Sequence, residues 1–271
     1  MARTEEPQLN PEVILGRLEK LSKLDKDRSV FGSNAHNYQL NSPLGISEIK
    51  EFENQHGISL PRDYRSFIAS FGNGGAGPGY GLFPFGRDDE GRWEETLSLG
   101  DPGNPFPHKD AWNLPDEFWR DEPNVPEGLP TGEEDQLWDE WDAKLARRYW
   151  STSIMNGAIP ICHLGCAHRQ WLVVVGEQKG FVWDDLRADH GGLTPVKNAN
   201  GDQMTFAEWY LAWLKEAERH KPQRAHHKLS NRLQHAFHPL ISPKGSRLRN
   251  WLQLLLLILI GVIVTALLAR F

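Results

Sequence analysis

An uncharged apolar run at the C-terminal end sets the first limit on how this chain folds. Residues 251–269 read WLQLLLLILIGVIVTALLA, and only Gln253, Gly261 and Thr265 fall outside the apolar set. A helix of this length rises about 28 Å, close to the ~30 Å hydrocarbon core of a bilayer. A buried core helix of the same length normally keeps a polar face. We therefore predict one C-terminal transmembrane helix, a tail anchor, over residues 251–269.

The charges beside this run predict its orientation. Seven Lys and Arg residues lie between residues 221 and 250, whereas one follows the run. The positive-inside rule then predicts a single-pass protein of the cell inner membrane, with the N-terminal domain cytoplasmic and the C-terminus outside. The polar N-terminus, MARTEEPQLN, lacks the apolar region of a cleaved signal peptide. The residues expected to form the anchor are Trp251, Leu254, Leu257, Ile260, Ile263 and Leu267, and the basic residues expected to face lipid are Lys244, Arg247 and Arg249.

The basic linker over residues 221–250 admits two interpretations. Leu229, Leu233, Phe237 and Leu240 recur at helical spacing between cationic residues, which fits a short helix lying on anionic lipid. A flexible solvated tether is the alternative. Pro239 and Pro243 end any helix before the apolar run begins.

The net charge of -6 conceals a split between body and tail. No acidic residue follows Glu218, so residues 1–220 carry -14 and the remainder +8. Residues 87–142 alone hold 18 acidic and 4 basic residues, with seven prolines and five tryptophans. This stretch is either a solvated loop whose aromatic residues cap the core, or an acidic face that captures a basic partner. For the second case the expected contact residues are Asp88, Asp89, Glu90, Glu94, Glu95, Trp112 and Trp119. A body of this charge should repel nucleic acid.

Helical periodicity predicts five helices in the body. Asn10 and Pro11 start the first, in which Val13, Ile14, Leu18 and Leu21 share one face. Ser47 is expected to cap a second helix through His56, which Gly57 ends. The remaining three are a helix opened by Pro61, an amphipathic helix over residues 133–150, and a closing helix after the capping box of Thr205 and Glu208.

Three strands are predicted in the second half, over residues 158–164, 171–175 and 181–184. The segment GEQKG joins the last two as a hairpin turn. Helices first, strands late and a helix last favour an α+β fold with a largely antiparallel sheet flanked by helices.

Four features carry possible chemistry, and each has a structural alternative. The segment CHLGCAH holds Cys162, His163, Cys166 and His168, but no second pair of metal ligands follows, and strand alternation should send Cys162 and His163 to opposite faces. A cysteine nucleophile would need a positioned base. Asp184 and Asp185 diverge on a strand, and we expect them to be solvated. The seven glycines of residues 72–86 lack the phosphate-loop pattern, which favours a structural turn. Two cysteines exclude a disulfide scaffold.

The block from residue 44 to residue 86 resembles the N-terminal signature of the SUKH superfamily, in its Smi/Knr-type branch. An acidic amphipathic helix, Leu-Pro, a Tyr-containing helix and Asn-Gly-Gly follow in order. The second half also fits, with Ile161 and Gly165, then GFVWDD, Pro195 and the closing helix, so the resemblance covers roughly residues 31–217. The residues that carry the signature are Leu60, Pro61, Tyr64, Phe67, Asn73, Gly74 and Gly75.

This resemblance implies a non-enzymatic, SUKH-like α+β binding domain with no cofactor or metal. Bacterial members commonly act as immunity proteins that neutralise polymorphic toxins, many of them nucleases, and fungal relatives regulate cell-wall synthesis. The expected organisation is an N-terminal helix (1–30), the SUKH-like domain (31–220) with its acidic stretch (87–142), the basic linker (221–250) and the anchor (251–269). The expected partners are a basic protein toxin and the lipid bilayer, and a membrane-anchored scaffold or regulator of envelope synthesis is the alternative.

Overall fold

The computed structural model describes residues 9–86, 100–126 and 128–220. The predicted linker and anchor, with every anchor and lipid-facing residue named above, lie outside this part of the chain, and so do Asp88, Asp89, Glu90, Glu94 and Glu95. In the described ranges, no helix has the length and apolar character needed to cross a bilayer.

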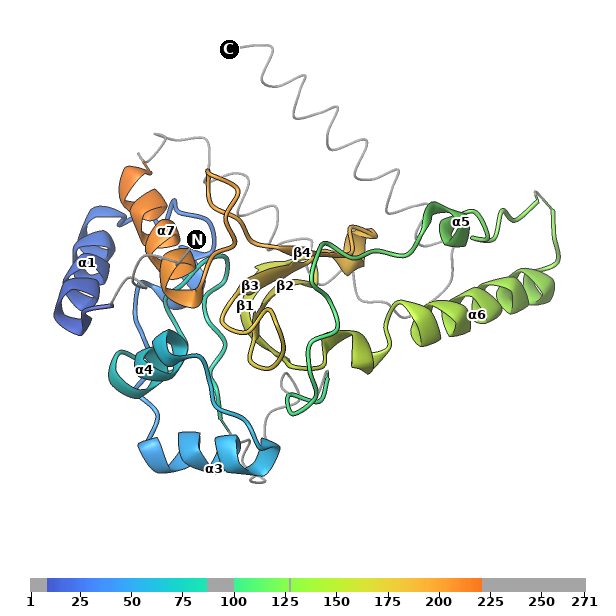
Figure 1. The fold of residues 1–271 in the computed structure, drawn as a ribbon. Coiled ribbons are helices and arrows are strands. Elements are labelled where there is room, and N and C mark those ends of the chain that lie inside the picture. The colour runs from blue at the N-terminus through green and yellow to red at the C-terminus, as the bar shows by residue number, and fades with distance from the viewer. Residues whose placement is uncertain (1–8, 87–99, 127, 221–271) are drawn as a thin grey trace, which may run out of the picture. The chain divides into compact units, whose positions relative to one another are not determined.

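One antiparallel sheet of four strands forms the centre of the fold, in the order β1-β2-β3-β4 (Figure 1). The strands are β1 (Ala158–Gly165), β2 (His168–Val173), β3 (Val182–Asp185) and β4 (Leu193–Pro195). The α+β class and the antiparallel sheet are confirmed, and the three predicted strands are present, although β2 covers His168–Val173 instead of residues 171–175. Sequence patterns missed β4, because three residues give too short a run to show alternation.

Strand alternation divides the sheet into two buried faces. Side chains on the first face join the main core, whereas those on the second join a separate aromatic cluster. Trp171 on β2 lies opposite Trp183 on β3, and both are fully buried on the second face. The first face carries Ile159, Ile161, Leu172 and Val182, and the second carries Ala158, Trp171, Val173, Trp183 and Leu193. A sheet buried on both faces needs covering elements on both sides.

Helices cover the first face of the sheet (Figure 1). They are α1 (Pro11–Leu24), α3 (Ile46–His56), α4 (Arg62–Ser70) and α7 (Phe206–Arg219). The short α2 (Ser33–His36) lies between α1 and α3 in the chain. Helix α7 contacts both α1 and α4. Its Phe206 and Tyr210 pack against Phe67 of α4 at ring-centroid distances of 5.2 and 4.8 Å. The predicted apolar spacings therefore correspond to real core faces.

Most predicted helix boundaries are confirmed, and two details are wrong. The Asn10 side chain accepts a hydrogen bond from Val13 N at 3.2 Å, and the capping box of Thr205 and Glu208 is present. Ser47 does not cap α3, which begins at Ile46; the N–H of Gly45 donates to the Glu48 side chain instead. Val13 is 55% exposed, because it lies roughly 80–140° around the helix from the buried residues Ile14, Leu18 and Leu21.

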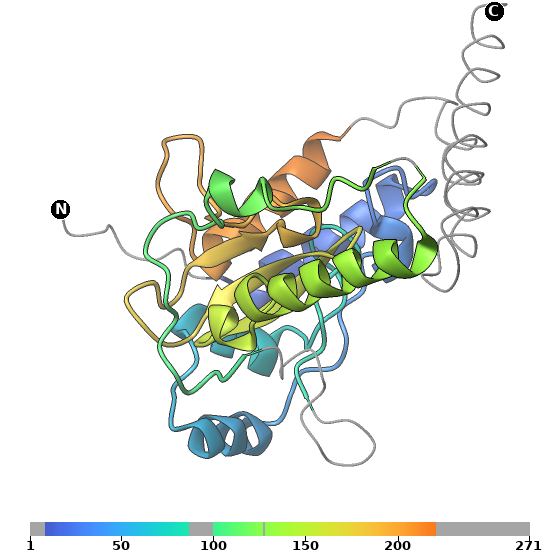
Figure 2. The same ribbon diagram turned by 90° about the vertical axis from the view of Figure 1, so that its right-hand side faces the viewer.

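The described part of the acidic stretch covers the second face. Phe106 and Trp112 pack on the sheet together with residues of the short helix η2 (Thr152–Met155). Beyond them lie α5 (Asp116–Trp119) and α6 (Thr131–Arg148). Figure 2, seen from this side, shows α6 in front of the strands, with α1 and α7 beyond them.

The glycine-rich segment runs beside β1 rather than around a ligand. The N–H of Tyr80 donates to His163 O at 2.8 Å, and the N–H of Phe83 donates to Ile161 O at 3.0 Å. Leu82 forms a bridge with Cys162. These backbone bonds cover the edge of β1, which supports the structural reading of the segment.

Candidate functional site

The described part of the acidic stretch folds over a cluster of aromatic residues, the third cluster of buried side chains. Phe118 of α5 and Trp141 of α6 pack with tilted rings at a ring-centroid distance of 5.1 Å. The buried members are Leu114, Phe118, Trp141 and Tyr149, and Trp112, Trp119, Trp138 and Leu145 pack against them. The predicted apolar side of α6 is thereby confirmed. The aromatic residues cap the core, and the charged side chains of the same stretch are left to face solvent.

Trp112, a predicted contact residue, fastens the stretch to the sheet. Its backbone N–H donates to Leu193 O at 2.8 Å, and its carbonyl accepts a hydrogen bond from Leu193 N at 2.7 Å. Its ring stacks on Tyr149 at 5.7 Å between centroids. Half-buried Trp112 therefore joins the second and third clusters.

Trp119, the other predicted aromatic contact, is held through its side chain. Its indole N–H donates to Leu114 O at 3.2 Å, and its ring stacks on His190 at 4.4 Å. The Asn113 side chain donates to His190 O at 2.7 Å. The connection between β3 and β4, which we call the platform, therefore contacts the acidic stretch through His190.

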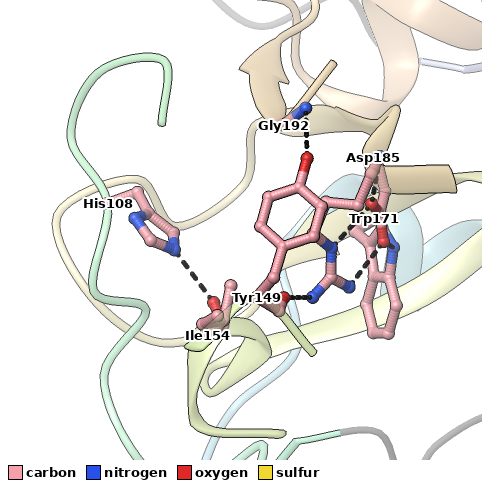
Figure 3. Close-up of polar contacts among 7 residues, drawn as sticks. His108, Tyr149, Ile154, Trp171, Asp185 and Gly192 are labelled. Carbon is pink, nitrogen blue, oxygen red and sulfur yellow. Dashed lines mark hydrogen bonds and ion pairs between the residues drawn. The ribbon is translucent and has the colours of Figure 1, made fainter. Parts of the chain in front are cut away.

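A buried ion pair lies at the centre of this platform (Figure 3). Asp185 and Arg187 are each 5% exposed. Arg187 Nε and Nη2 donate to the two carboxylate oxygens of Asp185, both at 2.8 Å, and Nη1 donates to Tyr149 O at 3.1 Å. The bidentate geometry and the third bond compensate the cost of removing both charges from water. The pair therefore joins β3 to the C-terminal end of α6.

Figure 3 also shows the polar contacts of neighbouring groups, of which the pair His108 and Ile154 is separate from the ion pair. The Tyr149 hydroxyl accepts from Gly192 N at 3.0 Å, and Trp171 Nε1 donates to Asp185 at 3.2 Å. His108 Nε2 lies 3.0 Å from Ile154 O. Burial raises the pKa of Tyr149 and lowers the pKa of His108, so both rings are uncharged at neutral pH. Arg187 and Asp185 are then the charged members of the network.

One flank of α6 presents an exposed line of carboxylates, Asp135, Asp139 and Asp142, which we call the α6 stripe. The spacing i, i+4, i+7 places the three on one side of the helix. Lys144 does not neutralise the stripe, since its ammonium lies 2.6 Å from Asp121 and 4.7 Å from the Phe118 ring centroid. That contact ties α6 to the segment after α5.

The prediction that Asp184 and Asp185 are both solvated is wrong. Their predicted divergence is correct, because Asp185 joins the ion pair on the second face and Asp184 belongs to the first. Gln170 Nε2 donates to Asp184 at 2.8 Å, and burial raises the pKa of the Asp184 carboxyl. The burial of Asp185 is not predictable from the sequence, because Arg187, which compensates its charge, begins the 3-10 helix η3 (Arg187–Asp189), whose three residues are too few to show periodicity.

The cysteine and histidine cluster does not converge on one point. Cys162 is buried and its thiol donates to Pro78 O at 3.0 Å, while His163 lies on the opposite side of β1. Burial raises the pKa of the Cys162 thiol far above neutrality, which disfavours the nucleophilic thiolate. His168 Nε2 lies 2.9 Å from Asp189. Within the described ranges, no group of three or more His, Cys, Asp or Glu side chains is placed to hold a metal ion.

Comparisons with known proteins give one match. No curated protein and no solved structure matches the chain. A family model, described as the SMI1 / KNR4 family (SUKH-1), matches residues 43–196. The matched range includes α3, α4, the glycine-rich segment, the acidic stretch and all four strands. It covers more than half of the chain, and the protein therefore belongs to the SMI1/KNR4 (SUKH-1) family.

Proposed function

We propose that this protein is a non-enzymatic binding module, tethered to the inner membrane, that acts as an immunity protein against a basic protein toxin. Domains of this family bind protein partners in general. The observation that carries the proposal is the α6 stripe, three exposed carboxylates on a helix that a buried ion pair fixes to the sheet. A surface held in this way loses little conformational entropy when a partner binds.

A toxin that cleaves nucleic acid suits such a surface. Its active site must hold phosphate and is therefore positively charged, so a rigid acidic face can block it and accelerate association by electrostatic steering. Asp88, Asp89, Glu90, Glu94 and Glu95 would extend the acidic face, and their contribution stays a prediction. The body charge of -14 points to a basic partner and disfavours nucleic acid.

Growth rescue tests the proposal directly. The full chain is co-expressed with the toxin encoded beside its gene, and rescue of growth together with a recoverable complex is the expected result. Neutralising the α6 stripe (Asp135→Asn, Asp139→Asn, Asp142→Asn) should weaken the complex by about tenfold or more, since each lost charge contact at an interface has a measurable effect.

The matched control neutralises three exposed acidic residues far from α6, by Glu12→Gln, Asp27→Asn and Glu216→Gln. This triple variant changes the net charge equally but should preserve rescue. If wild type gives neither rescue nor complex, the immunity role is refuted. If both triple variants weaken the complex equally, only the overall charge matters and the stripe is not the contact surface.

The membrane tether is proposed from residues 251–269 and from the basic residues that precede them. Replacing Ile260 and Ile263 by lysine places two charges near the centre of the run, at a cost of about 2.5–3.5 kcal/mol each. The variant should move from the membrane fraction to the soluble fraction. Gln253→Leu, which increases apolarity, should stay in the membrane, and unchanged fractionation of the lysine variant would refute the tether.

A membrane-anchored regulator of envelope or cell-wall synthesis is the second candidate. The apolar run favours it, because an anchor also confines a regulator to the site of envelope assembly. This role requires a growth or envelope defect on gene deletion in cells that lack the toxin. The immunity role requires no such defect.

A further inference from the structure

His190 is an exposed histidine in the platform, and its ring lies on an indole. It directly follows η3, and its imidazole stacks on Trp119 of α5 with 4.4 Å between ring centroids and 20° between ring planes. Trp119 in turn meets Tyr149 edge-on at 4.9 Å between centroids. The imidazole therefore covers one face of an indole that packs against the third cluster.

Hydrogen bonds fix both partners of this stack. The φ of His190 is 60°, in the left-handed region that histidine adopts more readily than most residues. Its N–H donates to Arg187 O at 3.1 Å, and its carbonyl accepts from Asn113 Nδ2 at 2.7 Å. Trp119 Nε1 donates to Leu114 O at 3.2 Å. The two rings are thus held together by contacts that do not depend on the charge of the imidazole.

A stack of this kind distinguishes the charged form of a histidine from the neutral form. A cation over an indole face is attracted by the quadrupole of the ring, and tryptophan gives the strongest such attraction among the aromatic residues. Histidine is the side chain that ordinarily becomes charged between about pH 8 and pH 5. Protonation of His190 should therefore strengthen its contact with Trp119 and hold α5 more firmly on the platform.

The charged groups around the stack nearly cancel, so the indole is the specific partner of a protonated His190. Four carboxylates of α5 and the platform lie in ion pairs, which are Glu117–Arg120, Asp121–Lys144, Asp185–Arg187 and Asp189–His168, at 3.8, 2.6, 2.8 and 2.9 Å. Arg148, whose guanidinium lies over the Phe118 ring, and the exposed Asp116 have opposite signs. These charges give the stack no strong field of either sign.

We infer that His190 and Trp119 form an acid-strengthened latch, which holds α5 on the platform more firmly when the histidine is protonated. We call this pair the α5 latch. It acts against His108 on the same face, since burial lowers the pKa of His108 and protonation of that ring costs stability. The latch would keep α5 in place in acid while other contacts of the second face weaken. It concerns the fold of this chain alone and does not depend on the proposed function.

Hydrogen exchange of the α5 amides tests the latch in the full chain in detergent. The amides that report on this turn are those of Phe118, Arg120, Asp121 and Glu122, which donate to backbone carbonyls of residues 115–119. Protection is corrected for the intrinsic exchange rate and compared between pH 7.5 and pH 5.5. His190→Phe keeps a stacked ring without the charge, and every other histidine is shared with wild type. Wild type should gain about twofold to fivefold more protection in acid than this variant, as one exposed cation–π contact allows.

Further variants separate the stack from neighbouring charges. His168→Gln removes the other histidine that contacts the platform and should keep the acid response. His190→Gln should lose the response as His190→Phe does. Trp119→Phe keeps a ring that attracts cations less strongly and should reduce the response. Circular dichroism and the melting temperature of each variant show that the fold is retained.

Three results would overturn the α5 latch. The first is an equal gain of protection in wild type and in both His190 variants. The second is loss of the acid response in His168→Gln, which would assign it to the ion pair with Asp189. The third is a full response in Trp119→Phe, which would show that the indole is not the partner. Growth rescue measures the proposed function separately, so either idea can fail without the other.

Discussion

The two faces of the sheet are buried by different means. On the first face, four helices contribute apolar side chains at regular spacing, and Phe67, Phe206 and Tyr210 pack with exposed fractions of zero. On the second face, a proline-rich stretch with one long helix contributes large aromatic residues, and a buried ion pair fixes it in place. The first face is stabilised by packing that many residues share. The second depends on a few specific polar contacts.

This difference bears on function, because the α6 stripe belongs to the second face. The ion pair connects the stripe to the sheet through Tyr149 O. A change in the first core should act on the whole fold, whereas a change at the ion pair should act mainly on the position of α6. Mutations that separate these two effects can test the comparison.

The largest effect is expected at Phe67 on the first face. Its ring stacks on Phe71 at 5.1 Å and contacts two rings of α7, so Phe67→Ala leaves a cavity that several elements line. The free energy of unfolding should fall by about 3–5 kcal/mol. Urea unfolding followed by tryptophan fluorescence measures the change. Leu24→Ala, at a residue that is 66% exposed, is the control and should change stability by less than about 0.5 kcal/mol.

The next largest effect is expected at the ion pair. Arg187→Met keeps the length of the side chain but leaves the Asp185 carboxylate buried without its counter-charge, which should cost about 3 kcal/mol. The double variant Asp185→Leu with Arg187→Met should recover most of this loss, because no unpaired charge remains. Equal losses in the single and double variants would show that packing, rather than charge compensation, joins the two elements.

The double variant also tests the link to function. If the fold recovers but α6 is no longer fixed through Tyr149 O, partner binding should stay weakened. Restored stability together with full binding would mean that Arg187 does not position the stripe.

The two faces also differ in how much of each could be predicted from the sequence. The first face was largely predicted, because helix periodicity, the Asn10 cap and the Thr205–Glu208 capping box are local signals. On the second face the apolar side of α6 was predicted, but the Asp185–Arg187 pair and β4 were not. An ion pair between the last residue of β3 and the first residue of the three-residue 3-10 helix η3 leaves no periodic signal, and its burial depends on the distant Trp171 and Tyr149.

The candidate site shows the same limit. Trp112 and Trp119 were predicted as contacts with a partner, and the structure also gives both a role in fastening the acidic stretch. Their residue type and acidic surroundings are equally compatible with exposed side chains that contact a partner and with half-buried side chains that hold the acidic stretch on the sheet. Only the positions of Leu193 and His190, both supplied by the β3–β4 region, distinguish the two.

A histidine near each face makes stability depend on pH, and His36 should have the larger effect. Burial lowers the pKa of His36 from 6.5 to about 4, and its Nδ1 accepts from Tyr38 N at 3.0 Å. The unfolded chain therefore binds more protons between these two values, so stability is complete above pH 6.5 and falls as pH decreases towards 4. The loss should reach about 3 kcal/mol.

His36→Gln should remove most of this dependence. On the second face, burial also lowers the pKa of His108, so His108→Gln should reduce the dependence in the same direction. Unfolding curves at several pH values, measured for both variants and for wild type, show which face loses more stability in acid. A wild-type stability that does not change between pH 7 and pH 4.5 would contradict both assignments.

The smallest effect on stability is expected at the α6 stripe. Asp135, Asp139 and Asp142 are exposed, and removing their mutual repulsion offsets the loss of any favourable contact. The triple asparagine variant should therefore unfold within about 0.5 kcal/mol of wild type. A larger loss would mean that the carboxylates stabilise α6, and weakened partner binding would then have a structural cause. Unchanged stability with weakened binding would assign the stripe to recognition of the partner.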